Sequence, residues 1–529
     1  MSKVSKNVKV SAKPKNAVAS DDAADSLMMK RALAAIGILC LISTIVFDKS
    51  KEMGGAVFPI MCLLGAAVCA GYLYYEKKLT TENAVLLIIA AGFLLRLNYV
   101  IYTPLSETTR IRQHDLFAFG GQKGHSAYIE HFYNNGFTLP DFDPTAKSQF
   151  YHPPLHHLLA AMWMRILTTF GMSYTRAIGS LQFLTLFYSS CCMLVCERIF
   201  TRLRLKGGFK LLALSIIAFH PIFFMLAGSV NNDVLALLLT LLSVYTALRW
   251  YEQPTTKNIL MIALSIGLGM STKLSAALVA IPIALLFLMK LISDKKHVYE
   301  NILQFCKFGL VCIPLGLWFP IRNAIRFDVP LTYVQRLSEN SDQYVGSYSV
   351  FERLFDLSDH PFKNVFLNRV TTGADYFEYN PFVGIIKTSI FGEYNFADTN
   401  ETILPFCRIL LVLNMVMISL SIIALVYFAL KKGGALDTTE KVFLVFYQLL
   451  IFFYFIKFCF DFPHNCSMDF RYIVPTAVLG AFFIASSAQR FGEDNKKKEI
   501  AVKAVNITVT SATILFCLSS VIVYIMLGA

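Results

Sequence analysis

Apolar and polar stretches alternate along most of the chain. The apolar runs are near the ~20 residues that an α-helix needs to cross a bilayer. They are residues 28–47, 56–75, 83–102, 176–199, 210–228, 234–250, 259–290, 303–320, 403–430, 442–460, 472–487 and 505–527. Because 259–290 is long enough for two crossings, the pattern predicts an all-α membrane protein with about thirteen transmembrane helices.

Two apolar runs need separate interpretation. Run 259–290 is interrupted by the polar residues 271–273, which predicts a hairpin whose tip reaches the outer face at Lys273. Run 155–170 is apolar, but counting it as a crossing would put the basic stretch beginning at Arg202 on the outer face. We therefore expect residues 155–170 to lie along the membrane surface or to dip into it.

The composition supports a membrane protein and excludes an ordinary soluble one. Hydrophobic residues make up 56% of the 529 residues and charged residues only 16%, whereas soluble domains carry roughly 25% charged residues. The net charge of +13 comes from short Lys and Arg clusters between the apolar runs. This is the positive-inside pattern that sets topology, so we expect no nucleic-acid partner. The twelve cysteines show no zinc-site spacing and are expected to be small core residues.

The polar segments divide the chain into five parts. Residues 1–27 are rich in lysine and lack an apolar core, which predicts a disordered cytoplasmic tail and not a signal peptide. The other parts are an N-terminal transmembrane hairpin at 28–82, a transmembrane core at 83–327 with a first external loop at 103–175, a second external segment at 328–402, and C-terminal transmembrane helices at 403–529.

The first external loop is the densest polar stretch of the chain. It contains six of the ten histidines, and Asp115 follows shortly after the apolar run that ends near Tyr102. Membrane enzymes usually carry out their chemistry near such a boundary. The dense polar stretch, centred on Gln113, His114 and Asp115, is therefore the expected place of function.

The predicted topology brings polar residues from distant parts of the chain to the same outer face. They are Arg112, Asp115, His152, Asp233, Lys273, Arg322 and the run 461–471. Cations can hold the phosphate leaving group of a lipid-linked substrate, and a carboxylate can deprotonate an attacking hydroxyl. Any one of these residues can also be only a membrane-boundary anchor.

Several short segments together resemble the C-fold (GT-C) membrane glycosyltransferases. They are Leu-Arg-Leu at 95–97, Gln-His-Asp at 113–115, the segment 149–155 with its His-Pro-Pro, Asn-Asn-Asp at 231–233, Thr-Lys-Leu at 272–274 and Asp-Phe-Arg-Tyr at 469–472. The resemblance covers about residues 83–487. Within this fold, the chain most resembles the branch that includes protein O-mannosyltransferases and the aminoarabinose transferases of lipid A. These are glycosyltransferase families 39 and 83.

The resemblance implies an enzyme that moves a single sugar from a polyprenyl-phosphate donor to an extracytoplasmic acceptor, with inversion at the anomeric carbon. Asp115 would be the general base. Asp233 would be a second acidic position, which with Asp115 could hold a divalent cation such as Mg²⁺ or Mn²⁺. The resemblance would place Lys273 near the donor phosphate. Arg322 and Arg471 are assigned to phosphate binding as well, only because of their predicted position on the outer face.

Substrate binding is expected from Arg112, His114, His125 and His152. Many relatives carry two adjacent acids where this chain has His114 followed by Asp115, so metal dependence stays open. The acceptor can be a protein, a lipid or a wall glycan. We also expect membrane lipid as a partner that surrounds the transmembrane helices.

The candidate residues also have structural interpretations. Asp115 can cap a loop helix or pair with a nearby arginine, and residues 231–233 can be only a turn with an N-cap. The histidines of 152–157 can be interfacial hydrogen-bonding groups or metal ligands on one helix face. His220, before a proline inside an apolar run, is expected to be a buried hydrogen-bonded histidine.

Aromatic residues of the second external segment could stack on a sugar or line an acceptor groove. They are Tyr344, Tyr348, Tyr376, Tyr379 and Tyr394.

Two other functions remain open. A transporter or flippase of lipid-linked sugars would place ionisable residues near the middle of the membrane, where this chain has few besides Arg96 and His220. A non-catalytic protein that binds polyprenyl phosphate would keep its function without Asp115. The basic tail fits a bacterial plasma membrane or the endoplasmic reticulum, and we expect the bacterial membrane.

Overall fold

The computed structural model describes residues 15–48, 57–105, 124–356, 364–367, 378–393 and 401–528. The first part contains α1 (Lys15–Val46), α2 (Val57–Tyr75), α3 (Thr81–Tyr102), α4 (Gly124–Asn134), η2 (Pro144–Ala146), α5 (Leu155–Thr169), α6 (Tyr174–Gly179), α7 (Leu181–Arg202), α8 (Gly207–Phe219), α9 (Pro221–Gly228), α10 (Asp233–Glu252), α11 (Thr256–Thr272), η3 (Leu274–Val279), α12 (Ala280–Ser293) and η4 (Lys295–His297).

The second part contains α13 (Val298–Phe327), α14 (Val350–Phe355), α16 (Pro381–Phe391), η6 (Glu401–Ile403), α17 (Leu404–Leu430), α18 (Thr438–Asp461), η7 (Asn465–Met468), η8 (Phe470–Tyr472), α19 (Pro475–Asp494) and α20 (Glu499–Met526). Within the described residues the only β pairing is an isolated bridge between Tyr344 and His464. The predicted all-α architecture is therefore confirmed.

Many of these helices are long and apolar enough to cross a membrane. Nine of them in the described part of the chain meet that condition singly. Helices α8 and α9 meet it together, bent by 44° at their junction, which brings the number to at most ten. The chain is a multi-pass membrane protein, but the predicted count of about thirteen crossings is not confirmed.

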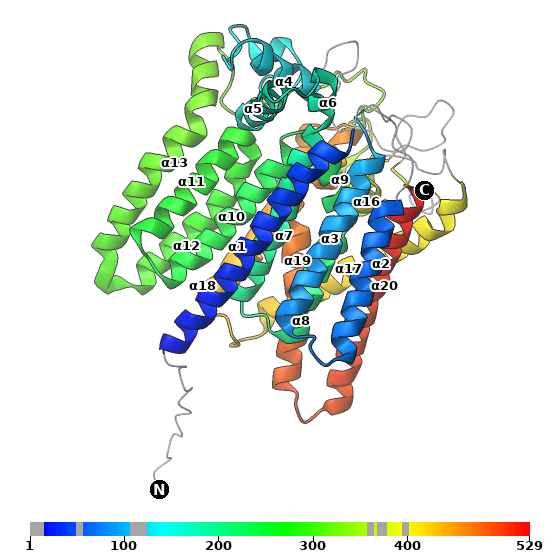
Figure 1. Ribbon diagram of the computed structural model, residues 1–529. Helices are drawn as coiled ribbons and strands as arrows, with labels where there is room; N and C mark the ends of the chain where they lie inside the picture. The colour runs from blue at the N-terminus through cyan, green and yellow to red at the C-terminus, as the bar shows by residue number, and fades with distance from the viewer. Residues whose placement is uncertain are drawn as a thin grey trace.

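The helix bundle has two ends that differ in chemistry. Helices α7 and α10 pack side by side (Figure 1), and NH1 of Arg202 and Oε2 of Glu252, in their last turns, are 2.6 Å apart. Asp233, the first residue of α10, therefore lies at the opposite end. We call these the Arg202 end and the Asp233 end.

Helix α5 lies with α4 and α6 at the Asp233 end (Figure 1). It begins directly after Pro154, in keeping with the tolerance of helix starts for proline. Its 15 residues fall short of a crossing. This agrees with the prediction that residues 155–170 do not cross the membrane.

Arg96 of α3 is fully buried against the break between α8 and α9. Pro221 has no N–H, so the carbonyl of Ile217, four residues earlier, cannot receive a helical hydrogen bond. The Arg96 guanidinium donates instead to the carbonyls of Ile217 at 3.0 Å and Ala218 at 2.8 Å. Two further hydrogen bonds, to α3 and α7, complete its surroundings. Arg96 thus satisfies the backbone of a broken helix in an apolar region.

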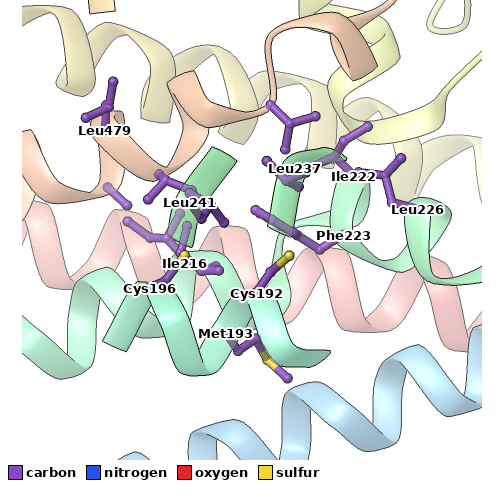
Figure 2. Packing of buried hydrophobic residues seen from close by; sticks show 14 of the residues in the cluster. Cys192, Met193, Cys196, Ile216, Ile222, Phe223, Leu226, Leu237, Leu241 and Leu479 are labelled. Carbon is purple, nitrogen blue, oxygen red and sulfur yellow. The ribbon is translucent and has the colours of Figure 1, made fainter. Parts of the chain in front are cut away.

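One part of the hydrophobic core lies where α7, α8, α9, α10 and α19 meet, as Figure 2 shows from close by. Cys192 and Cys196 of α7 lie among Ile216, Phe223 and Leu241 of the neighbouring helices, and all five are buried. A free thiol packs as a small apolar group. These two cysteines therefore have the core position predicted for them.

The N-terminal boundary differs from the prediction. Helix α1 begins at Lys15, within the segment 1–27 that the composition assigned to a disordered tail. Residues 16–25 include four alanines, which favour helix and can extend a transmembrane helix beyond its apolar part. The lysine content alone gave no sign of this extension.

Candidate functional site

Three charged side chains from distant parts of the chain meet at the Asp233 end. Lys273 donates from Nζ to Oδ1 of Asp233, and Oδ2 of the same carboxylate lies 3.8 Å from NH1 of Arg471. The side chains of Asp233 and Arg471 are 5% exposed and that of Lys273 is 16% exposed. With little water between them, these charges interact more strongly than at an open surface. We call this group, together with Asp469, the charged cluster.

The turn before α10 holds Asp233 and joins it to α11. Asn231 accepts at Oδ1 from the N–H of Asp233 at 3.0 Å, and Asn232 donates from Nδ2 to the carbonyl of Thr272 at 3.1 Å. Helix α11 ends at that threonine, and Lys273 has an extended conformation before η3 begins. The predicted break at Lys273 is confirmed, and its side chain reaches Asp233. The turn at 231–233 is thus both a structural turn and part of the cluster.

The loop between α18 and α19 supplies Arg471 and Asp469. Asp469 accepts at Oδ1 from the N–H of Arg471 at 2.8 Å, and its Oδ2 lies 3.9 Å from Nε of Arg471. The Asp469 side chain is 1% exposed. The described part of the cluster therefore contains two carboxylates and two cations held within a small volume.

Tyr472 ends the Asp-Phe-Arg-Tyr segment of the resemblance, but the sequence assigned it no role in the site. Its ring centroid lies 5.1 Å from Nζ of Lys273 and 5.0 Å from Cζ of Arg471, within the range of cation–π attraction. The predicted crossing began at Tyr472, whereas α19 begins at Pro475. The later start leaves Tyr472 in the loop, where its ring contacts both cations.

Histidines of α4, of the segment before α5 and of the start of α5 lie near the charged cluster. Nδ1 of His125 and Nε2 of His157 are 2.8 Å apart, so one ring donates and the other accepts. The ring of His125 also stacks on that of His152, with centroids 5.8 Å apart. His125 and His152, both predicted to bind substrate, therefore lie beside each other.

His156 and His157, at the start of α5, are completely buried. Burial lowers the pKa of His156 to about 3; His125 acts in the same direction and Asp233 in the opposite one. Burial also lowers the pKa of His157 well below its usual value, with His125 and His156 adding to the effect. Both imidazoles are therefore neutral near pH 7. The effect of Asp233 on the pKa of His156 shows that this histidine and the charged cluster influence each other electrostatically.

Arg322 lies on α13 and binds the first external loop. Its NH2 donates to the carbonyl of Pro140, and its NH1 donates to Oδ1 of Asn323 at 2.9 Å. One turn later NH2 of Arg326 pairs with Oδ1 of Asp141 at 2.5 Å. Within the described residues, no hydrogen bond or ion pair joins Arg322 to the charged cluster. Its role at the donor phosphate stays a prediction.

Several predicted site residues lie outside the described part of the chain. They are Arg112, His114 and Asp115 of the first external loop, and Tyr376 and Tyr394 of the second external segment. Their roles stay predictions. Among the other tyrosines, Tyr348 and Tyr379 stack with ring centroids 4.0 Å apart, and Tyr344 contacts His464.

The described residues contain no cluster of metal-ligand side chains. They contain no group of three or more His, Cys, Asp or Glu side chains that could hold a metal ion. One oxygen of Asp233 bonds Lys273 and the other faces Arg471, and these positive charges disfavour a metal ion beside that carboxylate. The predicted pair of metal ligands also needs Asp115, which lies outside the described residues.

Helix α16 contributes a buried brace that the sequence pattern did not indicate. Nζ of Lys387 and Oε2 of Glu378 are 2.7 Å apart, and the two side chains are 1% and 0% exposed. Asn465 donates from Nδ2 to the carbonyl of Glu378 at 2.7 Å, and the N–H of Phe470 donates to Oγ1 of Thr388 at 2.9 Å. The brace therefore fastens the loop of the charged cluster to the second external segment. A single lysine in an apolar stretch was the only sequence signal.

Comparison with known proteins gives one family match. Residues 151–318 match the family described as dolichyl-phosphate-mannose-protein mannosyltransferase. No curated protein is similar enough in sequence to match the chain.

Solved structures of an oligosaccharyltransferase from Archaeoglobus fulgidus are distantly similar. The apo form gives a TM-score of 0.48 at 13% identity, covering 84% of this chain and 55% of that chain. The archaeal complex with an inhibitory peptide and a dolichol-phosphate gives 0.40 at 13% identity, with the same coverage. The complex with zinc and sulfate gives 0.46 at 12% identity. The chain spans about half the length of these structures, and at this distance the likeness supports no functional conclusion.

The family match overlaps the candidate site. It includes Asp233 and Lys273 of the charged cluster and the histidines of 152–157. The expected resemblance is confirmed for this part of the chain, since residues 151–318 match the family described as dolichyl-phosphate-mannose-protein mannosyltransferase.

Proposed function

We propose that the chain is a membrane glycosyltransferase that moves a single sugar from a polyprenyl-phosphate donor to an extracytoplasmic acceptor. The family match over 151–318 supports the reaction class. The observation that carries the proposal is the charged cluster, because three distant parts of the chain bring a carboxylate and two cations to one little-exposed place. The family description favours a hydroxyl of a protein as the acceptor over one of a lipid or a glycan.

In the proposed complex Lys273 and Arg471 hold the donor phosphate. An ammonium group has three N–H donors and a guanidinium has five, so contacts to Asp233 leave donors for phosphate oxygens. Asp233 offsets the repulsion between the two cations before the donor binds. As the bond between sugar and phosphate breaks, the cations stabilise the negative charge that builds up on the leaving phosphate.

The proposed chemical step is a displacement at the anomeric carbon. The acceptor oxygen attacks this carbon while Asp115 takes the hydroxyl proton as general base. The new bond forms on the face opposite the breaking one, so the configuration inverts. The polyprenyl phosphate leaves with the electron pair of the broken bond. His125 and His152, beside the cluster, together with Arg112 and His114, are proposed to bind substrate.

The test is sugar release from a panel of radiolabelled polyprenyl-phosphate sugars by the purified protein in lipid, with crude membranes as acceptor. We expect wild type to turn over a donor and Asp115→Asn to lose about 10²- to 10⁴-fold in rate while still binding it. Asp141→Asn, an 80% exposed carboxylate of the same loop, is the matched control and should keep its rate. Donor that binds to wild type without transfer would refute the proposal.

A chelator decides whether a divalent cation takes part. If Asp115 and Asp233 hold Mg²⁺ or Mn²⁺, the chelator should abolish turnover and the added ion should restore it. Turnover that is unchanged by the chelator would exclude this cation role. The test matters because the positive neighbours of Asp233 disfavour a metal ion at this carboxylate.

Transport of lipid-linked sugars receives no specific support from the described residues. It predicts ionisable groups near mid-membrane that line a pathway. Arg96 donates hydrogen bonds to backbone carbonyls of α8. His220 accepts at Nδ1 from the N–H of Ile222 at 3.4 Å. Both residues serve the break between α8 and α9.

A further inference from the structure

A pocket lies at the Arg202 end of the bundle, remote from the charged cluster. It is enclosed by the end of α17, the connection to α18 and the last turns of α19, and it contains about 440 Å³ of empty space open to the surface. Arg204, just after α7, donates from NH1 to the carbonyl of Ala435 in this connection at 2.8 Å. The pocket is therefore fixed to the end opposite Asp233.

Cations dominate the lining of this pocket. Lys431, Lys441 and Arg490 line it. Asp494 lies 3.2 Å from Nζ of Lys431 and 3.0 Å from Nε of Arg490, measured from its Oδ2. Glu493 is the one carboxylate among the lining residues. With Asp494, which pairs with Lys431 and Arg490 from outside the lining, three cations face two acids. The surplus of positive charge favours an anionic ligand.

Two buried polar atoms at the pocket have no hydrogen-bond partner among the described residues. They are the hydroxyl of Tyr427 and Nε of Arg490, whose contact with Asp494 lacks hydrogen-bond geometry. A buried donor without an acceptor is costly, and such atoms in a native protein need an explanation. A ligand rich in acceptor oxygens would satisfy the Tyr427 hydroxyl, and Arg490, which is already ion-paired with Asp494, would contribute its charge and further N–H donors.

The outer face of α17 beside the pocket is apolar. Ile422, Ile423, Val426 and Leu430 are all at least half exposed. In a membrane protein such side chains contact acyl chains. A ligand with a charged head and apolar tails could therefore place its head in the pocket and its tails along α17.

We propose that this pocket binds the phosphate group of an anionic membrane lipid. Lys431, Arg490 and the hydroxyl of Tyr427 would donate to the phosphate oxygens. Lys441 keeps its bonds to the carbonyls of Lys431 and Gly433, at 2.7 and 2.6 Å, and contributes its charge. Basic pockets between transmembrane helices on the cytoplasmic side are known to bind phosphorylated lipid headgroups. The site is independent of the proposed transferase reaction.

The test is native mass spectrometry of the full chain in neutral detergent, titrated with phosphatidylglycerol or phosphatidylcholine. We expect phosphatidylglycerol to bind preferentially. The double variant Lys431→Gln/Tyr427→Phe should weaken this binding by about tenfold. Lys432→Gln removes the same charge from the exposed neighbouring position, outside the pocket lining, and should bind as wild type does.

Other outcomes would overturn the proposal. Equal binding of the two lipids, or undiminished binding of phosphatidylglycerol by the double variant, would show that the pocket does not select an anionic lipid. Displacement of phosphatidylglycerol by inorganic phosphate at similar concentration would assign the pocket to a free anion. If the double variant fails to fold, Tyr427→Phe alone decides, because it removes one hydroxyl and should still weaken binding severalfold.

Discussion

Asp233 shows how a carboxylate can stay charged where little water reaches it. Its side chain is 5% exposed and lies between Lys273 and Arg471. A lone charge at this depth would lose most of its hydration, so each member of the group stabilises the charged form of the others. The ring of Tyr472 adds to the stability of both cations. Two cations are thereby held close together before any phosphate binds.

The variant Lys273→Met separates the structural role of this group from its proposed catalytic role. Removing the lysine leaves Asp233 with only the longer contact to Arg471, and breaking a buried ion pair costs about 3 kcal/mol of stability. The double variant Lys273→Met/Asp233→Asn removes the unpaired charge and should recover most of this loss. Thermal unfolding in detergent measures both effects.

Sugar release by the same two variants completes this test. Both should have lost donor turnover, since both lack the proposed phosphate ligand. Lys257→Met, at an exposed position near the Arg202 end, is the matched control for loss of a lysine. A double variant that is stable and fully active would remove Lys273 from the mechanism.

The buried histidines predict a loss of stability in acid. An unfolded histidine has a pKa near 6.5, whereas burial lowers that of His156 to about 3 in the fold. Between these values the unfolded chain binds the proton and the folded chain does not, so stability falls as the pH drops below about 6.5. His156 alone should cost about 1.4 kcal/mol one pH unit below that value.

Thermal unfolding of His156→Leu between pH 7.5 and 5 measures this effect. The variant should lose less stability in acid than wild type does. His297→Leu replaces an exposed histidine at the other end of the bundle and serves as the control. Parallel pH profiles of wild type and His156→Leu would contradict the prediction.

At the scale of helices, breaks rather than continuous elements position the site. Helix α9 ends close to the start of α10, and the α11 break brings Lys273 to the same place. Gln182 of α7 donates from Nε2 to the carbonyl of Thr103 at 2.6 Å and to that of Gly228 at 2.9 Å. It thereby satisfies the ends of α3 and α9. Side chains of continuous helices thus hold the ends of interrupted ones.

The break between α8 and α9 gives a prediction about Arg96. Arg96→Met removes the donor for the carbonyls of Ile217 and Ala218, and each unsatisfied buried carbonyl costs about 1–3 kcal/mol. Adding Pro221→Ala supplies an N–H four residues after Ile217, so the double variant should recover part of the stability. Thermal unfolding is the measurement, with Arg326→Met, at a 52% exposed arginine, as control. A small effect of Arg96→Met would contradict the structural role.

For the molecule as a whole, the sequence predicted features that depend on periodicity and charge. Long apolar runs predicted the membrane helices. The requirement that basic clusters stay on one side of the membrane predicted that α5 does not cross it. The polar tripeptide at 271–273 predicted the break at Lys273. The predicted topology put Asp233, Lys273 and Arg471 at the same depth in the membrane, and their side chains do lie together.

The sequence could not predict features that depend on which side chains meet. Arg322 shares the depth of the charged cluster but binds Pro140, because position along a helix fixes depth and not direction. The sequence gives no sign of the ion pair between Lys387 and Glu378, because the two residues come together only in the folded chain. Residues 15–27 are continuous with the apolar part of α1, and the composition of the tail alone does not reveal this continuity.

The sidedness of the molecule gives the last prediction. Lys431, Lys432 and residues 496–498 lie at the Arg202 end. From the positive-inside rule we predict that this end faces the cytoplasm and that the Asp233 end lies outside. In intact cells, a membrane-impermeant maleimide should label Asp141→Cys but should label Lys497→Cys only after permeabilisation. Wild type measures the background from the native cysteines, of which Cys69 and Cys306 are exposed. The reverse pattern would put the charged cluster in the cytoplasm, where extracytoplasmic sugar transfer could not take place.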